Sequence, residues 1–162
     1  MKTIIISLLL PLFFASCIPI KTAKDISGYH IVDGNKNTKD EIKKANKFVF
    51  QVYKPQPVFE RFLRERYSHI KGFSPDYFTD TINGDTINFN IFHSTKSSKH
   101  IDLISPILLK DEGEFVQNGK TKYYITIVAT TTQGEDCLQT NSLYRHAVSK
   151  YLNELQMSFN AY

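Results

Sequence analysis

The sequence predicts an α+β fold, a single domain in which an antiparallel sheet of about five strands packs against two amphipathic helices. Two Asn-Gly pairs, Asn83-Gly84 and Asn118-Gly119, lie between segments that are typical of strands. Asn-Gly is a strong hairpin signal because both central residues of a type I′ turn have positive φ. Two other segments repeat apolar residues with the period of a helix. Strands that are joined by hairpins pair antiparallel, and helices on one face of such a sheet make an α+β fold.

A short helix, a strand and a longer helix are expected in the first half of the chain. Thr38 followed by Glu41 forms a capping box, which predicts a helix over residues 39–46. Residues 47–53 (KFVFQVY) are rich in Val, Phe and Tyr and predict a strand. Residues 58–70 predict an amphipathic helix, because their apolar side chains recur on one face. That face consists of Val58, Phe59, Phe62, Leu63, Tyr67 and Ile70.

The two hairpins are expected in the middle of the chain. The first pairs residues 79–82 with 85–93, and the second pairs 114–117 with 120–130. In both, the arms contain the β-branched and aromatic residues that pack well on a pleated surface. The run YITIVA within the last arm is the strongest candidate for a buried strand.

The chain closes with a predicted helix over residues 143–157, for which Asn141 or Ser142 is the expected cap. Its apolar residues recur at helical spacing and predict a stripe that packs on the sheet. The stripe consists of Leu143, Ala147, Val148, Tyr151, Leu152 and Leu155.

The N-terminus is typical of a secretion signal. Lys2 supplies a positive charge, and residues 4–14 (IIISLLLPLFF) form an apolar run. A membrane-spanning helix needs about 20 residues, so this run is too short to span and instead suits the apolar region of a signal peptide. The small residues Ala15 and Ser16 follow, and then Cys17.

Phe14-Ala15-Ser16-Cys17 resembles the lipobox of bacterial lipoproteins, with Phe14 at a position where Leu is usual. The resemblance implies cleavage before Cys17, a diacylglycerol on its thiol and an acylated amino group. Two or more acyl chains anchor a protein stably, because each buried methylene contributes about 0.8 kcal/mol. The expected organisation is a signal peptide over 1–16, a lipidated N-terminus and tether over 17–27, and one α+β domain over 28–162.

The resemblance also implies a place in the cell envelope. Ile18 follows the cysteine where similar lipoproteins retained at the inner membrane carry Asp, and the acidic run that directs some of them to the cell surface is absent. An outer-membrane position facing the periplasm is therefore favoured. The expected partner is membrane lipid, through acylated Cys17, with an envelope protein as a further candidate. Without Lys2, the expected mature part has 19 basic and 16 acidic residues, and this balance of +3 is too small to indicate nucleic-acid binding.

The histidines and cysteines form no pattern that predicts a metal or another cofactor, because neither a His-x-x-x-His pair nor a Cys-x-x-Cys pair occurs. Cys137 with His146 is the one conceivable Cys/His pair, and we interpret Cys137 as a buried structural thiol. A pair of carboxylates could in principle cleave glycosidic bonds. The candidates are Glu60, Glu65, Asp76, Asp80, Asp85 and Asp111.

A basic stretch lies next to the predicted tether. We interpret it as the solvated face of a helix, with contact to anionic headgroups or glycan as the functional alternative. It consists of Lys36, Lys39, Lys43, Lys44 and Lys47.

The sequence therefore favours a non-enzymatic envelope lipoprotein that binds a partner or has a structural role. Two alternatives stay open. One is an envelope hydrolase that uses Cys137 or a carboxylate pair, and the other is a lipoprotein immunity factor that protects against a toxin.

Overall fold

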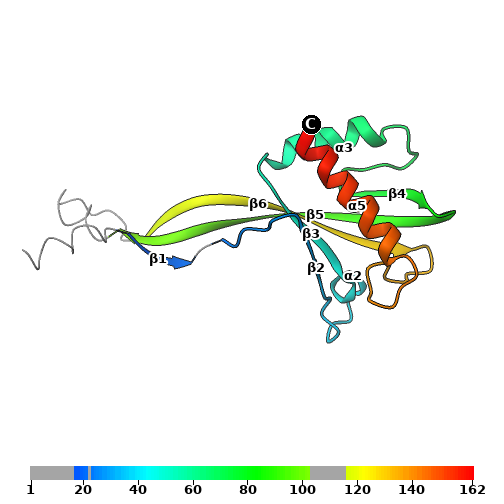
Figure 1. Ribbon diagram of the computed structural model, residues 1–162, viewed down its shortest axis with the longest axis horizontal. Helices are drawn as coiled ribbons and strands as arrows, with labels where there is room; N and C mark the ends of the chain where they lie inside the picture. The colour runs from blue at the N-terminus through cyan, green and yellow to red at the C-terminus, as the bar shows by residue number, and fades with distance from the viewer. Residues whose placement is uncertain (1–16, 22, 103–115) are drawn as a thin grey trace, which may run out of the picture. The chain divides into compact units, whose positions relative to one another are not determined.

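The computed structural model describes residues 17–21, 23–102 and 116–162, and the predicted signal peptide lies outside them (Figure 1). Side chains are described for residues 23–97 and 121–162. The elements follow the order β1 (Cys17–Lys21), β2 (Tyr29–Val32), α2 (Glu41–Lys44), β3 (Lys47–Val52), α3 (Gln56–Tyr67), β4 (Tyr77–Ile82), β5 (Asp85–Asp102), β6 (Val116–Thr131) and α5 (Arg145–Ala161).

The described strands join in one six-stranded sheet in the order β1-β5-β6-β3-β2, with β4 paired to β5. The pairs β1–β5, β2–β3, β3–β6 and β4–β5 are antiparallel. The predicted α+β class, with an antiparallel sheet packed against two amphipathic helices, is confirmed. Strands β1 and β2 were not expected, and each is short, with five and four residues.

Contacts between residues divide the chain into two compact units. The described part of the first, the three-stranded unit, comprises residues 17–21, 23–24, 96–102 and 116–122. Within it, the backbone of Cys17 pairs with that of Asp102, so residues expected to form a tether are instead part of a strand.

The second, the core unit, comprises residues 25–95 and 123–162 and contains all of the described helices. In Figure 1, α5 crosses the sheet, and its C-terminal end lies beside α3. The apolar residues that face these helices alternate along the strands, as the period of a half-buried sheet requires. Those that are almost completely buried include Phe48, Phe50, Ile87, Phe89, Ile125 and Ile127.

The two long helices bury the faces that their periodicity predicts, with two corrections. Helix α3 buries Phe59, Phe62, Leu63 and Tyr67, and the partly exposed Val58 packs against the same core. Ile70 also packs there, but it lies beyond the end of the helix at Tyr67. In α5, Val148, Leu152 and Leu155 are buried as expected, and the stripe continues to Phe159. Leu143 is 95% exposed, so its assignment to the stripe is wrong. The helix begins only at Arg145, and Leu143 therefore lies in the preceding turn.

The first predicted hairpin is confirmed. Ile82 pairs directly with Asp85, which leaves Asn83 and Gly84 as the two turn residues. Their φ angles are +54° and +91°, the positive values that a type I′ turn requires. Beyond the turn, Ile87 is fully buried, as the alternation of the second arm predicts.

The second predicted Asn-Gly turn is wrong. Asn118 and Gly119 lie inside β6, which runs without interruption from Val116 to Thr131 beside β5. The connection between β5 and β6 falls within residues 103–115, outside the described part of the chain. Glycine in a strand costs only about 0.5–1 kcal/mol relative to alanine, so continued pairing with a neighbouring strand can override the local turn preference.

Candidate functional site

An open groove of about 1080 Å³ lies on the surface of the core unit. Strands contribute Asn90 from β5 and Val128 and Thr130 from β6. One side, the α2 rim, is formed by residues 33–46, and the other, the loop rim, by residues 133–141. The groove-lining residues of the rims are Asp33, Lys36, Glu41, Ile42, Lys44, Ala45 and Asn46 on the first and Gln133, Gly134, Glu135, Asp136, Gln139, Thr140 and Asn141 on the second.

The groove lies on the sheet face that points away from the aromatic core. Asn90 alternates with the buried core residues Phe89 and Ile91, and Val128 alternates with Ile127 and Ala129. Since successive side chains point to opposite faces of a sheet, Asn90 and Val128 point away from α3 and α5. One face of the sheet therefore carries the core and the other carries the groove.

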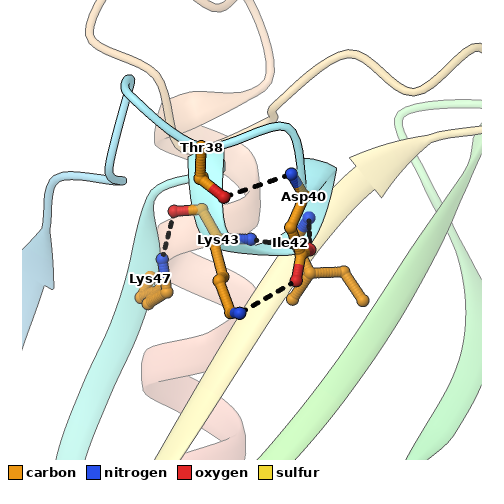
Figure 2. A network of polar contacts seen from close by, with 5 residues as sticks. All are labelled: Thr38, Asp40, Ile42, Lys43 and Lys47. Atoms are coloured by element: carbon orange, nitrogen blue, oxygen red, sulfur yellow. Dashed lines mark hydrogen bonds and ion pairs between the residues drawn. The ribbon is translucent and has the colours of Figure 1, made fainter.

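The α2 rim is held in shape by a cap at the start of α2 (Figure 2). Asp40 Oδ1 accepts hydrogen bonds from Ile42 N at 3.0 Å and Lys43 N at 3.3 Å. Thr38, the predicted cap, instead accepts a bond from Asp40 N at 3.2 Å through Oγ1. The bond from the Lys43 backbone is the main cause that lowers the pKa of the Asp40 carboxyl. The N-cap is therefore Asp40 and not Thr38, which the capping box predicted.

The basic stretch is largely used within this rim. Lys47 Nζ donates to the carbonyl oxygens of Lys43 at 3.1 Å and Ala45 at 2.8 Å, which satisfies acceptors at the end of α2. Lys43 lies 3.5 Å from Asp40, and Lys44 lies 3.0 Å from Glu41. Three of the five lysines, Lys43, Lys44 and Lys47, therefore make contacts with neighbouring residues of the same segment. Their positions can be explained without a binding partner.

Asn46 joins the two rims to the start of β3. Its Oδ1 accepts from Gly34 N at 3.0 Å, and its Nδ2 donates to Leu138 O at 3.2 Å. Its backbone N donates to Asp136 Oδ2 at 2.8 Å, while Asp136 Oδ1 accepts from Leu138 N at 2.9 Å. Asn46 is 8% exposed, so these bonds lie where an unpaired polar group would cost about 1–3 kcal/mol.

Gly34 allows the α2 rim to close on itself. A Cβ atom at this position would lie 1.7 Å from the carbonyl oxygen of Lys44 and 2.7 Å from that of Ala45. The next residue, Asn35, donates its backbone N–H to Lys43 O at 2.8 Å. Close approach of two backbone segments therefore requires glycine here.

The loop rim is held by backbone turns and by an arginine. Thr131 N donates to Glu135 O at 3.0 Å, and Gly134 N donates to Thr131 O at 3.0 Å. Arg145, at the start of α5, donates from Nη1 to Leu138 O at 2.6 Å. Both rims are therefore held in place by hydrogen bonds within the core unit.

Most of the side chains that line the groove are polar, and they carry more negative than positive charge. Four carboxylates, from Asp33, Glu41, Glu135 and Asp136, line the groove together with two lysines, Lys36 and Lys44. Side-chain amides, which can both donate and accept hydrogen bonds, supply most of the remaining polar groups. They are Asn46, Asn90, Gln133, Gln139 and Asn141.

Cys137 is fully buried, as predicted, and has the chemistry of a structural thiol. Burial is the main cause that raises its pKa to about 12, and the Glu135 and Asp136 carboxylates act in the same direction. Its Sγ lies 3.7 Å from Glu135 O. The thiolate is the nucleophilic form of cysteine, so this group is unreactive at neutral pH. The proposed partner His146 is exposed on α5.

The histidines are dispersed over the core unit. His30, His69 and His146 are exposed, and the side chain of His100 lies outside the described residues. His93 is half-buried against Phe59, with ring centroids 5.8 Å apart, and burial lowers its pKa. It lines a small pocket of about 170 Å³. Within the part of the chain that the structure describes, no three His, Cys, Asp or Glu residues are grouped to hold a metal ion.

None of the predicted carboxylate candidates within the described residues lines the groove. Asp80 accepts a hydrogen bond from the Tyr151 hydroxyl at 2.6 Å, and Tyr151 in turn lies 2.7 Å from the Tyr67 hydroxyl. Burial, followed by these neighbours, raises the pKa of Tyr151 well above its ordinary value. Asp85 accepts from Tyr144 at 3.0 Å.

The other predicted carboxylates have equally local roles or lie elsewhere. Glu65 accepts from Tyr162 at 3.0 Å, and Glu60 accepts from Gln56 Nε2 at 2.7 Å. Asp76 is exposed, and Asp111 lies outside the described residues.

Sequence reasoning did not identify the residues that shape the groove. Asp136 carries one local signal, since Asp side chains often accept a bond from the backbone N–H two residues on, as Asp136 does from Leu138. Asn46 and Gly34 carry no such signal, because their decisive contacts lie at a distance in the chain.

No helix among the described residues is long and apolar enough to cross a membrane. Cys17 is the first residue of β1, and its side chain lies outside the description. Comparison of the chain with family models, with curated proteins and with solved structures found no match.

Proposed function

We propose that this protein is a lipoprotein of the bacterial cell envelope that is anchored through Cys17 and binds a partner through the groove without catalysing a reaction. The observation that carries the proposal is the junction at Asn46, whose hydrogen bonds connect both rims of the open groove. A preformed concave surface is the usual form of a binding site. The buried, protonated Cys137 and the tyrosine-bonded Asp80 weigh against a hydrolase.

The anchor rests on the lipobox-like residues that precede Cys17. Acyl chains on this residue would hold the protein at an envelope membrane, with the periplasm-facing side of the outer membrane favoured. Cys17 begins β1, whose backbone pairs with Lys99–Asp102 of β5. A lipid on Cys17 would therefore be followed directly by paired backbone and not by a free tether.

The anchor is tested by expressing the full chain and a Cys17→Ala variant in bacteria with a clickable palmitate analogue. We expect labelling and membrane association for the natural chain and neither for the variant. Cys137→Ala is the matched control, because it removes the other cysteine and should keep the label. Intact mass of the membrane-extracted protein should show a chain that begins at an acylated Cys17, and a free thiol there would refute the anchor.

Binding through the groove is tested by photo-crosslinking in intact cells. A benzoylphenylalanine introduced at Gln139, which is exposed and lines the groove, should give a discrete adduct with an envelope component. The same residue at Glu154, which is exposed on α5, is the control and should give none. Absence of adducts at Gln139, Gln133 and Asn141 alike would refute the groove as a binding surface.

A further inference from the structure

We infer that the groove binds an extended polypeptide segment that carries Lys or Arg side chains, an inference that rests on the proposed function and names its partner by chemical class. Three properties of the groove support it: the sign of its charge, the hydrogen-bonding groups that it exposes, and the absence of aromatic rings from its lining.

The charge of the groove is opposite to that of the whole chain. The chain carries a formal charge of +4, whereas four carboxylates and only two lysines line the groove. One of those lysines, Lys44, is already 3.0 Å from Glu41. Complementary charge attracts partners and excludes those of the wrong sign. This lining therefore favours a cationic partner over nucleic acid or anionic lipid headgroups.

The net negative charge of the groove lies on the loop rim, because both lining lysines, Lys36 and Lys44, belong to the α2 rim. Asp33 and Glu41 belong to the α2 rim, and Glu135 and Asp136 belong to the loop rim. Asp136 uses both oxygens on backbone N–H groups of Asn46 and Leu138. Asp33 and Glu135 are both exposed, so they are the carboxylates best suited to meet a cation from outside.

The amide side chains suit a polypeptide backbone. Gln133, Gln139 and Asn141 are exposed and line the loop rim, and Asn90 faces them from β5 as a half-buried residue. Each amide offers both a donor and an acceptor, which matches the alternating N–H and C=O groups of an extended chain. A glycan would instead gain from rings that stack on sugar faces, and no Phe, Tyr or Trp is among the lining residues.

The rims also lower the cost of binding. Hydrogen bonds of Asn46 and Gly34 hold the α2 rim, and a hydrogen bond of Arg145 holds the loop rim. All of these bonds are within the protein and form before any peptide binds. A surface that is already ordered loses less conformational entropy when a flexible peptide settles on it. An extended segment can therefore bind without rearrangement of the groove.

The inference is tested with the detergent-solubilised full-length protein and a fluorescein-labelled decapeptide of alternating Lys and Ser. Fluorescence anisotropy should show saturable binding of this peptide and much weaker binding of a Glu/Ser decapeptide. The double variant Asp33→Asn/Glu135→Gln should weaken the affinity by about tenfold, because two charges that face the peptide are removed. The control Asp76→Asn/Glu154→Gln removes two exposed charges outside the groove. This control should change the affinity for the peptide by less than about twofold.

Two outcomes would overturn the inference. One is the absence of saturable binding of the Lys/Ser peptide up to about 1 mM, which corresponds to a free energy of only about −4 kcal/mol. The other is an equal loss of affinity in the control variant, which would indicate attraction by overall charge. If the crosslink at Gln139 still forms while the peptide fails to bind, the groove has a partner of different chemistry, and only this inference falls.

Discussion

The two faces of the sheet in the core unit are built from different interactions. The face under α3 and α5 packs through aromatic side chains. Phe59 of α3, for example, has ring contacts with Phe50, Phe62 and Phe159 at centroid distances of 4.8–6.2 Å. The opposite face carries the groove, whose rims depend on directional hydrogen bonds through Asn46 and Asp136. Burial of apolar area is non-directional and stabilises the whole unit, whereas the hydrogen bonds fix the shape of one surface.

This difference predicts that mutations on the two faces have different consequences. A buried aromatic side chain contributes to stability through a large apolar area, and its loss leaves a cavity. A groove residue contributes less to stability, because a net hydrogen bond is worth only about 0.5–1.5 kcal/mol. The core face should therefore be sensitive in melting experiments, and the groove face in binding experiments.

The largest effect is expected from Phe59→Ala. Phe59 is fully buried, so truncation should lower the free energy of unfolding by about 3–5 kcal/mol. Thr130→Ala on the groove face is the control and should change it by about 0.5 kcal/mol or less. Urea titration of both variants measures the difference, and equal losses would contradict the division between the two faces.

Gly34→Ala should have an intermediate effect that is centred on the groove. The added Cβ would overlap the Lys44 carbonyl, so the α2 rim must shift at a cost of about 1–3 kcal/mol. Hydrogen exchange should speed up at the N–H groups of Gly34 and Asn46, which lose their present partners. Lys36→Ala, in the same rim but exposed, should leave exchange unchanged. Unchanged protection in Gly34→Ala would contradict the close approach.

The two Asn-Gly pairs provide a sharper comparison. Gly84 has φ of +91°, and a β-branched residue there should cost about 1–2 kcal/mol. Gly119 lies inside β6, where valine is well suited to a strand, so Gly119→Val should be neutral or stabilising. Melting temperatures of the two variants measure this contrast. If Gly119→Val lowered the melting temperature as much as Gly84→Val, the result would favour a turn at Asn118-Gly119.

The smallest effect concerns His93, which lies at the edge of the aromatic face. Burial lowers its pKa in the folded state, while the Glu60 and Asp76 carboxylates act in the opposite direction. A lowered pKa means that the unfolded chain binds the proton more readily. The contribution of neutral His93 to stability is therefore intact above the pKa of histidine in the unfolded chain, about 6.5. It is lost as the pH falls from there toward the lower pKa of His93 in the folded state.

The measurement is the free energy of unfolding by urea at pH 7.5 and 5.5, settings on either side of the ordinary histidine pKa of about 6.5. His93→Leu should reduce the loss of stability between these two values, because the group that takes up the proton is gone. An exposed histidine, His69, provides the control as His69→Leu. An identical pH dependence in the natural chain and in His93→Leu would contradict a buried, unprotonated imidazole.

Local patterns predicted the elements whose residues act on their nearest neighbours. The apolar spacing of α3 placed Phe59, Phe62 and Leu63 in the core, because helical periodicity directly sets which side chains share a face. The turn at Asn83-Gly84 followed from the φ angles that these residues tolerate. Leu143 was misplaced because the start of α5 depends on the turn before Arg145, where Ser142 Oγ accepts a bond from Tyr144 N.

The groove could not be predicted in the same way. Its junction joins Asn46 to Asp136 and Leu138, which are 90 and 92 positions away in the sequence. A single asparagine has no local pattern that indicates such partners. The sequence also could not indicate which carboxylates line the groove, since tertiary contacts such as the tyrosine hydroxyls that bond Asp80 and Asp85 depend on the folded chain.

The sequence by itself determined the α+β class, the apolar face of α3, most of the stripe of α5 and the first hairpin, because periodicity and turn geometry act between near neighbours. The tertiary structure alone decided that Asn118-Gly119 continues a strand, that Cys17–Lys21 pairs with β5, and that two distant segments meet at Asn46. Those outcomes depend on pairing and hydrogen bonding between residues far apart in the chain, which become neighbours only when the sheet forms.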